Sequence, residues 1–108
     1  MPFQSVIPRP FTASGIQTFA PAVSGVYGIS NSQEWIYIGE ADDIQRALMD
    51  HFTDHNGPFQ KRSPMGFVYE TCARASRAAR QDRLVLEYEP ACNRFPNDYR
   101  RHESGGKN

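Results

Sequence analysis

The first half of the chain carries two short runs of β-branched and aromatic residues. Residues 26–29 are Val-Tyr-Gly-Ile and residues 35–38 are Trp-Ile-Tyr-Ile, and such residues favour β-strands. The five residues between the runs are Ser-Asn-Ser-Gln-Glu, a composition that is typical of turns. The pattern therefore predicts an antiparallel β-hairpin.

The segment after this hairpin has the period of a helix. Its apolar stripe repeats at spacings of three and four residues, as in an amphipathic helix, and Asp42 or Asp43 is placed to cap the first turn. The sequence His-Asn-Gly-Pro at residues 55–58 is expected to end the helix. We interpret His51 as a residue at the boundary of the core. The stripe consists of Ile44, Ala47, Leu48, His51 and Phe52.

A third strand and a second helix complete the regular part of the pattern. Residues 66–70, Gly-Phe-Val-Tyr-Glu, predict the strand. Thr71 can cap a helix that runs to about Tyr88 and ends before Pro90. The order strand, strand, helix, strand, helix predicts a small α/β domain, with helices flanking a three-stranded, mostly antiparallel sheet.

Both ends of the chain differ from this pattern. Residues 1–23 contain four prolines among scattered apolar residues, so we expect an irregular leader in which residues 11–19 contribute one short edge segment. Residues 24–98 are expected to form the folded domain. Residues 99–108 include Arg-Arg and Ser-Gly-Gly and are expected to be a disordered tail.

Composition narrows the class of protein. A chain of 108 residues has the size of one domain. Its formal net charge of zero argues against a generally sticky nucleic-acid binder, while it allows a local basic face. The two cysteines are too few for a disulfide framework. We find neither an apolar run near the ~20 residues of a membrane span nor a signal peptide, and we expect a soluble cytoplasmic protein with no membrane partner.

Two tripeptides with tyrosines ten residues apart are the most informative feature of the chain. Gly25-Val26-Tyr27 lies in the first predicted strand and Tyr37-Ile38-Gly39 in the second, and Pro90-x-x-Asn93 follows the second helix. Over roughly residues 25–93 these strings resemble the GIY-YIG family of metal-dependent DNA endonucleases. The resemblance implies a GIY-YIG-like fold, DNA as partner and, in an active member, Mg²⁺ or Mn²⁺ as cofactor.

The resemblance also implies roles for particular residues. Tyr27 matches the tyrosine that helps to activate or position the attacking water, Tyr37 matches the tyrosine beside it, and Asn93 matches the asparagine that completes the site. The family places an arginine on the first helix, where it stabilises the charge on the reacting phosphate. It places a glutamate on the second helix, where it holds the divalent cation.

Two of these positions depart from the family pattern. The arginine position, ten residues after Tyr37, holds Ala47, and the glutamate position, twelve residues before Asn93, holds Gln81. The neighbours Arg46 and Asp82 are candidate substitutes for the missing groups, although each is turned about 100° around its helix. Glu40 replaces a frequent lysine and, with Gln81 and Asp82, is a candidate metal ligand.

Basic residues gather in the second half of the chain. Four arginines recur at every third position of the second predicted helix, and a slanting stripe of this kind could follow a phosphate backbone. The alternative is a solvated helix face, partly paired with Glu70 and Asp82. The candidate nucleic-acid-binding residues are Arg74, Arg77, Arg80 and Arg83, together with Lys61 and Arg62.

Three interpretations remain open from the sequence. The first is a GIY-YIG-like domain with a degraded catalytic set that still binds nucleic acid. The second is a working divalent-metal DNA endonuclease with a relocated arginine and carboxylate. The third is a protein-interaction module, or a dimer, that uses the scaffold without nucleic acid. The sequence does not fix the oligomeric state.

Overall fold

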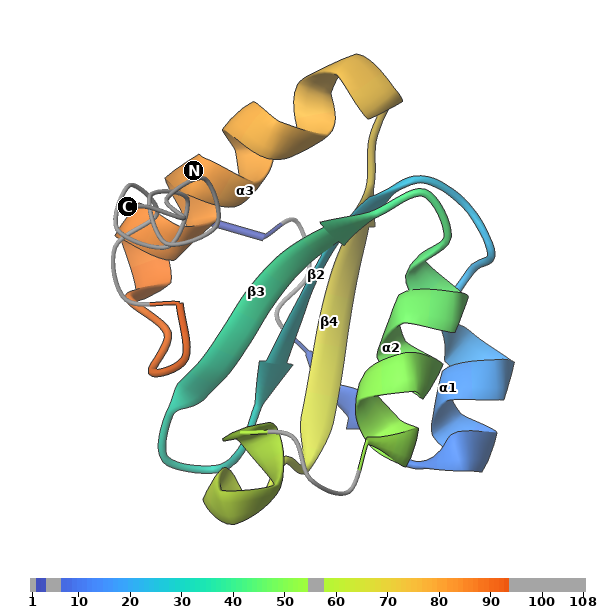
Figure 1. Ribbon diagram of the computed structural model, residues 1–108, viewed down its shortest axis with the longest axis vertical. Helices are drawn as coiled ribbons and strands as arrows, with labels where there is room; N and C mark the ends of the chain where they lie inside the picture. The colour runs from blue at the N-terminus through green and yellow to red at the C-terminus, as the bar shows by residue number, and fades with distance from the viewer. Residues whose placement is uncertain (1, 4–6, 55–57, 94–108) are drawn as a thin grey trace, which may run out of the picture.

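A four-stranded antiparallel sheet organises the part of the chain that the structure describes (Figure 1). The structure is a computed structural model that describes residues 2–3, 7–54 and 58–93. The strand order is β1-β4-β2-β3. The sequence predicted the three long strands. The predicted number of strands was too low by one, because the structure adds β1, a short strand at the edge of the sheet. The strands are β1 (Arg9–Pro10), β2 (Gly25–Ser30), β3 (Trp35–Ala41) and β4 (Gly66–Thr71).

Strand β2 lies at the centre and fixes the register of its neighbours. Tyr27 is opposite Gly39 of β3 on one side and opposite Tyr69 of β4 on the other. The pairing of β2 with β3 confirms the predicted hairpin, with an irregularity between Ile29 and Ser30. Because side chains alternate across a strand, Tyr27 and Gly39 face the same side of the sheet.

Helices cover both faces of this sheet (Figure 1). Helices α1 (Ala13–Phe19) and α2 (Ile44–Thr53) pack against each other on one face, and α3 (Arg77–Tyr88) packs along β3 and β2 on the other. Two 3₁₀ turns, η1 (Pro58–Arg62) and η2 (Arg74–Ser76), flank β4. None of the helices in the described ranges combines the length and the apolar character of a membrane span.

Helix α2 begins where the sequence predicted. The carboxylate of Asp43 accepts a hydrogen bond from the backbone N–H of Arg46 at 2.9 Å, which satisfies a donor that the first turn leaves free. Ile44 and Leu48 are fully buried, so the apolar stripe faces the sheet as expected. The segment at residues 55–57, which was expected to end this helix, lies outside the described residues.

The N-terminal segment is more regular than we expected. Where the sequence suggested an irregular leader, β1 pairs with β4 and α1 follows, with the Thr12 hydroxyl accepting from the N–H of Gly15 at 3.0 Å. The edge segment therefore lies before Phe11 rather than within residues 11–19. Helix α3 also begins later than predicted, at Arg77, because η2 precedes it. The expected tail at residues 99–108 lies outside the described residues.

The outer edge of β3 is closed by the residues that follow α3. The backbone N–H groups of Ala91 and Cys92 donate to the carbonyls of Trp35 and Ile36 at 3.0 and 2.8 Å. Further along, the buried Asn93 amide accepts from the N–H of Ile38 at 2.7 Å and donates to its carbonyl at 2.8 Å. These contacts occupy backbone groups that an edge strand otherwise leaves open.

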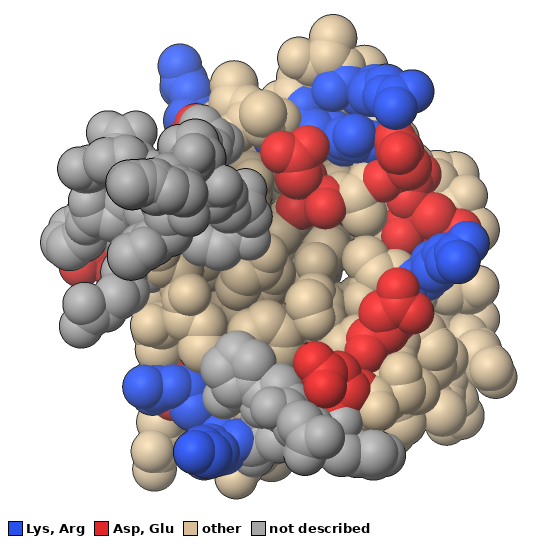
Figure 2. Space-filling model, viewed as in Figure 1, with Lys and Arg blue, Asp and Glu red and all other residues tan. Residues whose placement is uncertain are grey.

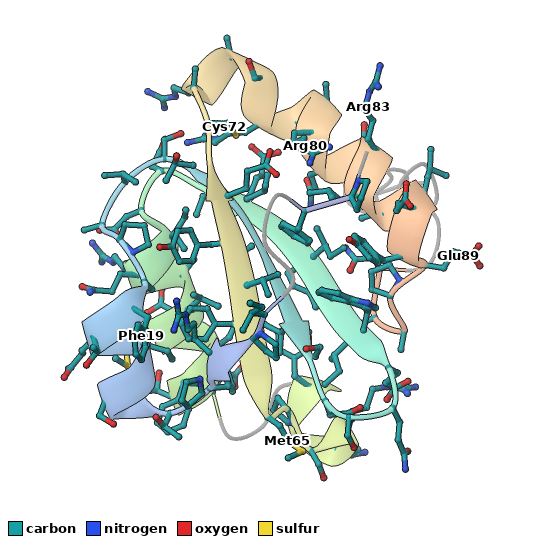
Figure 3. The ribbon with its side chains drawn as sticks, turned by 180° about the vertical axis from the view of Figure 1, so that it is seen from behind. Phe19, Met65, Cys72, Arg80, Arg83 and Glu89 are labelled. Carbon is teal, nitrogen blue, oxygen red and sulfur yellow. The ribbon has the colours of Figure 1, made fainter. Side chains whose placement is uncertain are left out.

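An ion pair lies between α3 and the sheet. Arg80 donates to both carboxylate oxygens of Glu70 at 2.7 and 2.8 Å, and to the carbonyl of Pro2 at 2.8 Å. The Glu70 side chain is only 8% exposed and that of Arg80 16%. The Glu70 hydrogen bonds raise the pKa of Arg80. Figure 3 shows Arg80 directed toward the sheet, whereas Arg83, one turn further along α3, points away from it.

Replacing Arg80 by methionine is expected to lower the free energy of unfolding by about 3–5 kcal/mol, because it leaves the buried Glu70 carboxylate without its cation. Urea unfolding at neutral pH measures this change. The matched control is Arg83→Met, which removes an exposed arginine from the same helix and is expected to change stability by less than ~0.5 kcal/mol. Equal effects of the two substitutions would show that the ion pair contributes no more to stability than a surface charge.

Candidate functional site

The tyrosine of the first motif lies at the centre of the candidate site. Tyr27 projects from β2 toward α2, where its hydroxyl is 2.8 Å from Nε2 of His51. The Tyr27 side chain is buried, so its hydroxyl needs a hydrogen-bond partner within the protein. His51 is this partner, and it lies on α2, seven residues after the helix begins at Ile44.

The glycine of the second motif makes room for this tyrosine. A Cβ atom at Gly39 would lie 2.5 Å from the Tyr27 hydroxyl and 2.8 Å from Cε2 of Tyr37. Both distances are too short for a real side chain, so only glycine lets the Tyr27 phenol pass across β3. Tyr27, Tyr37 and Gly39, which the two motif strings contain, therefore lie against one another in the structure.

Aromatic rings surround His51. The Tyr27 ring centroid is 5.7 Å from the imidazole, the Tyr37 centroid 5.4 Å and the Phe59 centroid 4.7 Å. The Tyr27 and Tyr37 centroids are 6.2 Å apart. Phe59 comes from η1, so strands, helix α2 and this 3₁₀ turn all contribute to one aromatic centre.

Burial lowers the pKa of His51 below its ordinary value of about 6.5, and the nearby Asp50 and Asp54 oppose this shift in part. The imidazole is therefore neutral at neutral pH. A neutral imidazole has one nitrogen that donates and one that accepts. It can thus take a proton through the hydrogen bond to Tyr27, with the direction of donation set by the tautomer.

From the sequence pattern, His51 was expected at the boundary of the core, with no chemical role. The residue lies one helical turn after Ala47, on the face of α2 that points toward the tyrosines. That spacing is the only signal in the sequence for its role. Periodicity alone could not separate this histidine from an apolar neighbour on the same stripe.

Neither of the candidate arginine positions brings a positive charge to the tyrosine pair. Ala47, at the family arginine position, packs against the apolar core. Arg46 is exposed on α2, and the spacing around the helix turns it away from the face that carries His51.

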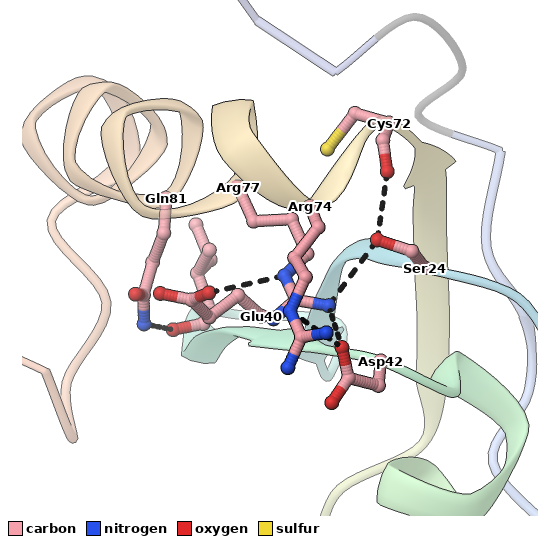
Figure 4. A network of polar contacts seen from close by, with 8 residues as sticks. Ser24, Glu40, Asp42, Cys72, Arg74, Arg77 and Gln81 are labelled. Carbon is pink, nitrogen blue, oxygen red and sulfur yellow. Dashed lines mark hydrogen bonds and ion pairs between the residues drawn. The ribbon is translucent and has the colours of Figure 1, made fainter.

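The candidate metal ligands are engaged in other contacts. The amide nitrogen of Gln81 donates to the carbonyl of Ile38 at 3.1 Å, and the carboxylate of Glu40 accepts from Arg77 at 3.2 Å (Figure 4). Asp82, next to Gln81 on α3, is partly buried. Within residues 2–3, 7–54 and 58–93, no group of three His, Cys, Asp or Glu side chains is arranged to hold a metal ion.

Arg77 forms a small network that joins α3 to the end of β3 (Figure 4). Its guanidinium contacts Glu40, Asp42 and the hydroxyl of Ser24, and its side chain is 11% exposed. Arg74 adds a longer contact to Asp42 at 3.6 Å. The hydrogen bond from Arg77 lowers the pKa of Asp42 and raises that of Arg77 itself.

The predicted arginine stripe is only partly available for a ligand. Arg77 and Arg80 are directed into ion pairs within the protein, whereas Arg74 and Arg83 are exposed. Figure 2 shows basic side chains beside acidic ones rather than a broad basic surface. On η1, Lys61 is exposed, and the neighbouring Arg62 pairs with Glu34 at 3.1 Å.

A pH titration of stability should reveal the buried imidazole. Because the pKa of His51 is lower in the folded protein than in the unfolded chain, the unfolded chain binds the proton first as the pH falls below about 6.5. The wild type should therefore lose stability relative to His51→Gln between about pH 7.5 and pH 5, measured by urea unfolding. A difference between the two proteins that stays constant over this range would contradict the shift.

Comparison with known proteins supports the resemblance at the level of the fold. No family model matches the chain, and no curated protein matches it. Among solved structures, it is similar to the magnesium-bound GIY-YIG N-terminal endonuclease domain of UvrC from Thermotoga maritima. The match has 21% identity and a TM-score of 0.59 and covers 69% of this chain and 91% of that one. A point mutant of the same domain, bound to its catalytic divalent cation, matches with 20% identity and a TM-score of 0.60, over 69% of this chain and 90% of that one.

These matches agree with the two tyrosine strings, with the order of the long strands and with helices on both faces of the sheet. The chain therefore has the fold of the GIY-YIG endonuclease domain.

Proposed function

We propose that this protein is a GIY-YIG-like domain that is impaired in phosphodiester hydrolysis and acts by binding nucleic acid. The observation that carries the proposal is the loss of charge at the positions of the family arginine and glutamate, Ala47 and Gln81. Each residue also has a structural contact in its place, Ala47 with the core and Gln81 with the carbonyl of Ile38.

Hydrolysis of a phosphodiester builds up negative charge on the non-bridging oxygens, which a cation or a set of donors must stabilise. The methyl group of Ala47 cannot do so, and Arg46 is exposed on another face of α2. Loss of a single donor of this kind in other enzymes costs about 10²–10³ in rate. We therefore expect a slow enzyme at best.

The donor set also fits a divalent cation poorly. Mg²⁺ prefers carboxylate oxygens, and Gln81 offers a neutral amide whose nitrogen is bonded to Ile38. Glu40, the other candidate, is paired with Arg77. We assign no reaction step to a metal ion at these residues.

A working endonuclease is the second candidate, and the Tyr27–His51 hydrogen bond favours it. A neutral imidazole beside a phenol can accept a proton from a bound water or a hydroxyl group. In that case Arg46, together with Asp82 or Glu40, would have to supply the missing charges, and the metal would be Mg²⁺ or Mn²⁺.

Nucleic acid is the ligand that the fold suggests, and the exposed cations support it to a limited extent. Lys61 and Arg62 lie on the same 3₁₀ turn as Phe59, beside the aromatic centre, and Arg74 and Arg83 are exposed on the α3 side. The net charge of zero and the ion pairs of Arg77 and Arg80 favour the remaining alternative, a protein partner.

Nicking of supercoiled plasmid with Mg²⁺ or Mn²⁺ tests the impaired site. The folded wild type should cleave at least about 100-fold more slowly than an active GIY-YIG enzyme assayed beside it, because one charge-stabilising donor alone contributes that much. Tyr27→Phe and Asp82→Ala accompany the wild type. Cleavage near the rate of the control enzyme that disappears in Tyr27→Phe would establish a working nuclease instead, and its loss in Asp82→Ala as well would identify the substitute carboxylate.

The salt dependence of DNA binding tests the partner. The logarithm of the affinity should fall with the logarithm of salt concentration, and the slope should decrease by about one to two when Lys61 and Arg62 are replaced by alanine. Arg9→Ala, which removes an exposed charge that lies over the Phe19 ring, is the control and should leave the slope unchanged. Absence of binding at low salt would reject nucleic acid and favour the protein partner.

A further inference from the structure

Phe59 stands at the point where η1 approaches the candidate site. Its side chain is 7% exposed. Its ring contacts His51 edge-to-face, with the planes at 62°, and lies 4.9 Å from the Tyr37 centroid. Phe59 lies outside the two tyrosine strings, and no sequence pattern indicates a role for it.

The backbone does not set the orientation of the imidazole. The last torsion of a histidine side chain is broad, because it joins a tetrahedral carbon to a planar ring. The ring therefore takes its orientation from its neighbours, which among the described residues include the phenols of Tyr27 and Tyr37 and the ring of Phe59. Of the three ring centroids, that of Phe59 is the nearest to the imidazole, at 4.7 Å, and its side chain carries no hydroxyl group to bond to the imidazole.

We propose that Phe59 is a positioning residue: its ring covers His51 and holds the imidazole so that Nε2 meets the Tyr27 hydroxyl. The contact is directional, since aromatic rings prefer edge-to-face over random arrangements. An alanine at this position would leave the imidazole free to turn and would admit water to it. The Tyr27–His51 pair would then be a mixture of hydrogen-bonded and open states.

The Phe59 ring also shields the His51 imidazole from water. Burial is the main cause of the lowered pKa of His51, and the two groups that oppose it, Asp50 and Asp54, lie on or next to its own helix. Among the described residues of the other elements, the titratable groups whose rings contact it are the phenols of Tyr27 and Tyr37, and Phe59 carries no charge. Loss of the Phe59 ring should therefore move the pKa toward its ordinary value.

A titration of the His51 ring by NMR tests this role in the full chain. The His51 signals among the three histidines are identified by their absence in His51→Gln. The variants are Phe59→Ala and the conservative Phe59→Leu. The control is Phe11→Ala, because Phe11 is buried to a similar degree, at 5% exposed, belongs to the same core and contacts Phe52 rather than His51.

The expected result is a higher His51 pKa in Phe59→Ala than in the wild type. Phe59→Leu should restore most of the difference, because leucine again excludes water. Phe11→Ala should leave the titration unchanged although it also removes a buried ring. If Phe59→Ala does not fold, the smaller shift in Phe59→Leu relative to the wild type gives the same test.

An unchanged titration in the folded Phe59 variants would overturn the positioning role, and so would an equal shift in Phe11→Ala. The role deepens the proposed function, because it concerns the proton-accepting pair that the impaired site retains. The two are separable by experiment, since the imidazole titrates whether or not the protein binds or cleaves DNA. If the protein does cleave, the acid limb of its pH profile should move with the His51 pKa in Phe59→Leu.

Discussion

The buried hydroxyl of Tyr27 is the constraint from which the arrangement of the site follows. Tyr27 lies on β2, one of the two inner strands, and its side chain points toward α2, where its hydroxyl finds a hydrogen-bond partner. The partner is His51, which α2 brings into range because the helix is capped at Asp43, directly after β3. The phenol can reach it only if Gly39 has no side chain. One polar contact thus links two strands and a helix, and it makes glycine necessary at that position.

The opposite face of the sheet carries an apolar cluster and also the ion pairs that join α3 to the strands. Glu70 forms an ion pair with Arg80 between α3 and the sheet. At the start of the same helix, Arg77 pairs with the carboxylates of Glu40 and Asp42. A buried charge without a partner is costly, so these arginines are needed by the fold before any ligand is considered. This explains why a regular stripe of arginines in the sequence yields only two exposed members in the structure.

Local patterns in the sequence were sufficient for the hairpin, for the apolar face of α2 and for a cap at Asp42 or Asp43, because each depends on residues a few positions apart; the structure selects Asp43. The strand at Arg9–Pro10 could not be found in this way, since it consists of two residues held by pairing with β4. Helix α1 was missed for a similar reason: seven residues bury only Gly15 and Ile16. The contact between His51 and Tyr27 joins residues 24 apart and depends on how α2 packs on the sheet, which no local pattern contains.

The amide at position 81, where the resemblance implies a glutamate, has a physical consequence for the edge of the sheet. The carbonyl of Ile38 accepts hydrogen bonds from both Gln81 and Asn93. An ionised glutamate at position 81 could not donate such a bond, and its negative charge would face the partial negative charge of the carbonyl oxygen. The amide instead donates to this carbonyl, so α3 is held against β3 by a neutral hydrogen bond, and the position to which the resemblance assigns a metal ligand contributes to the scaffold.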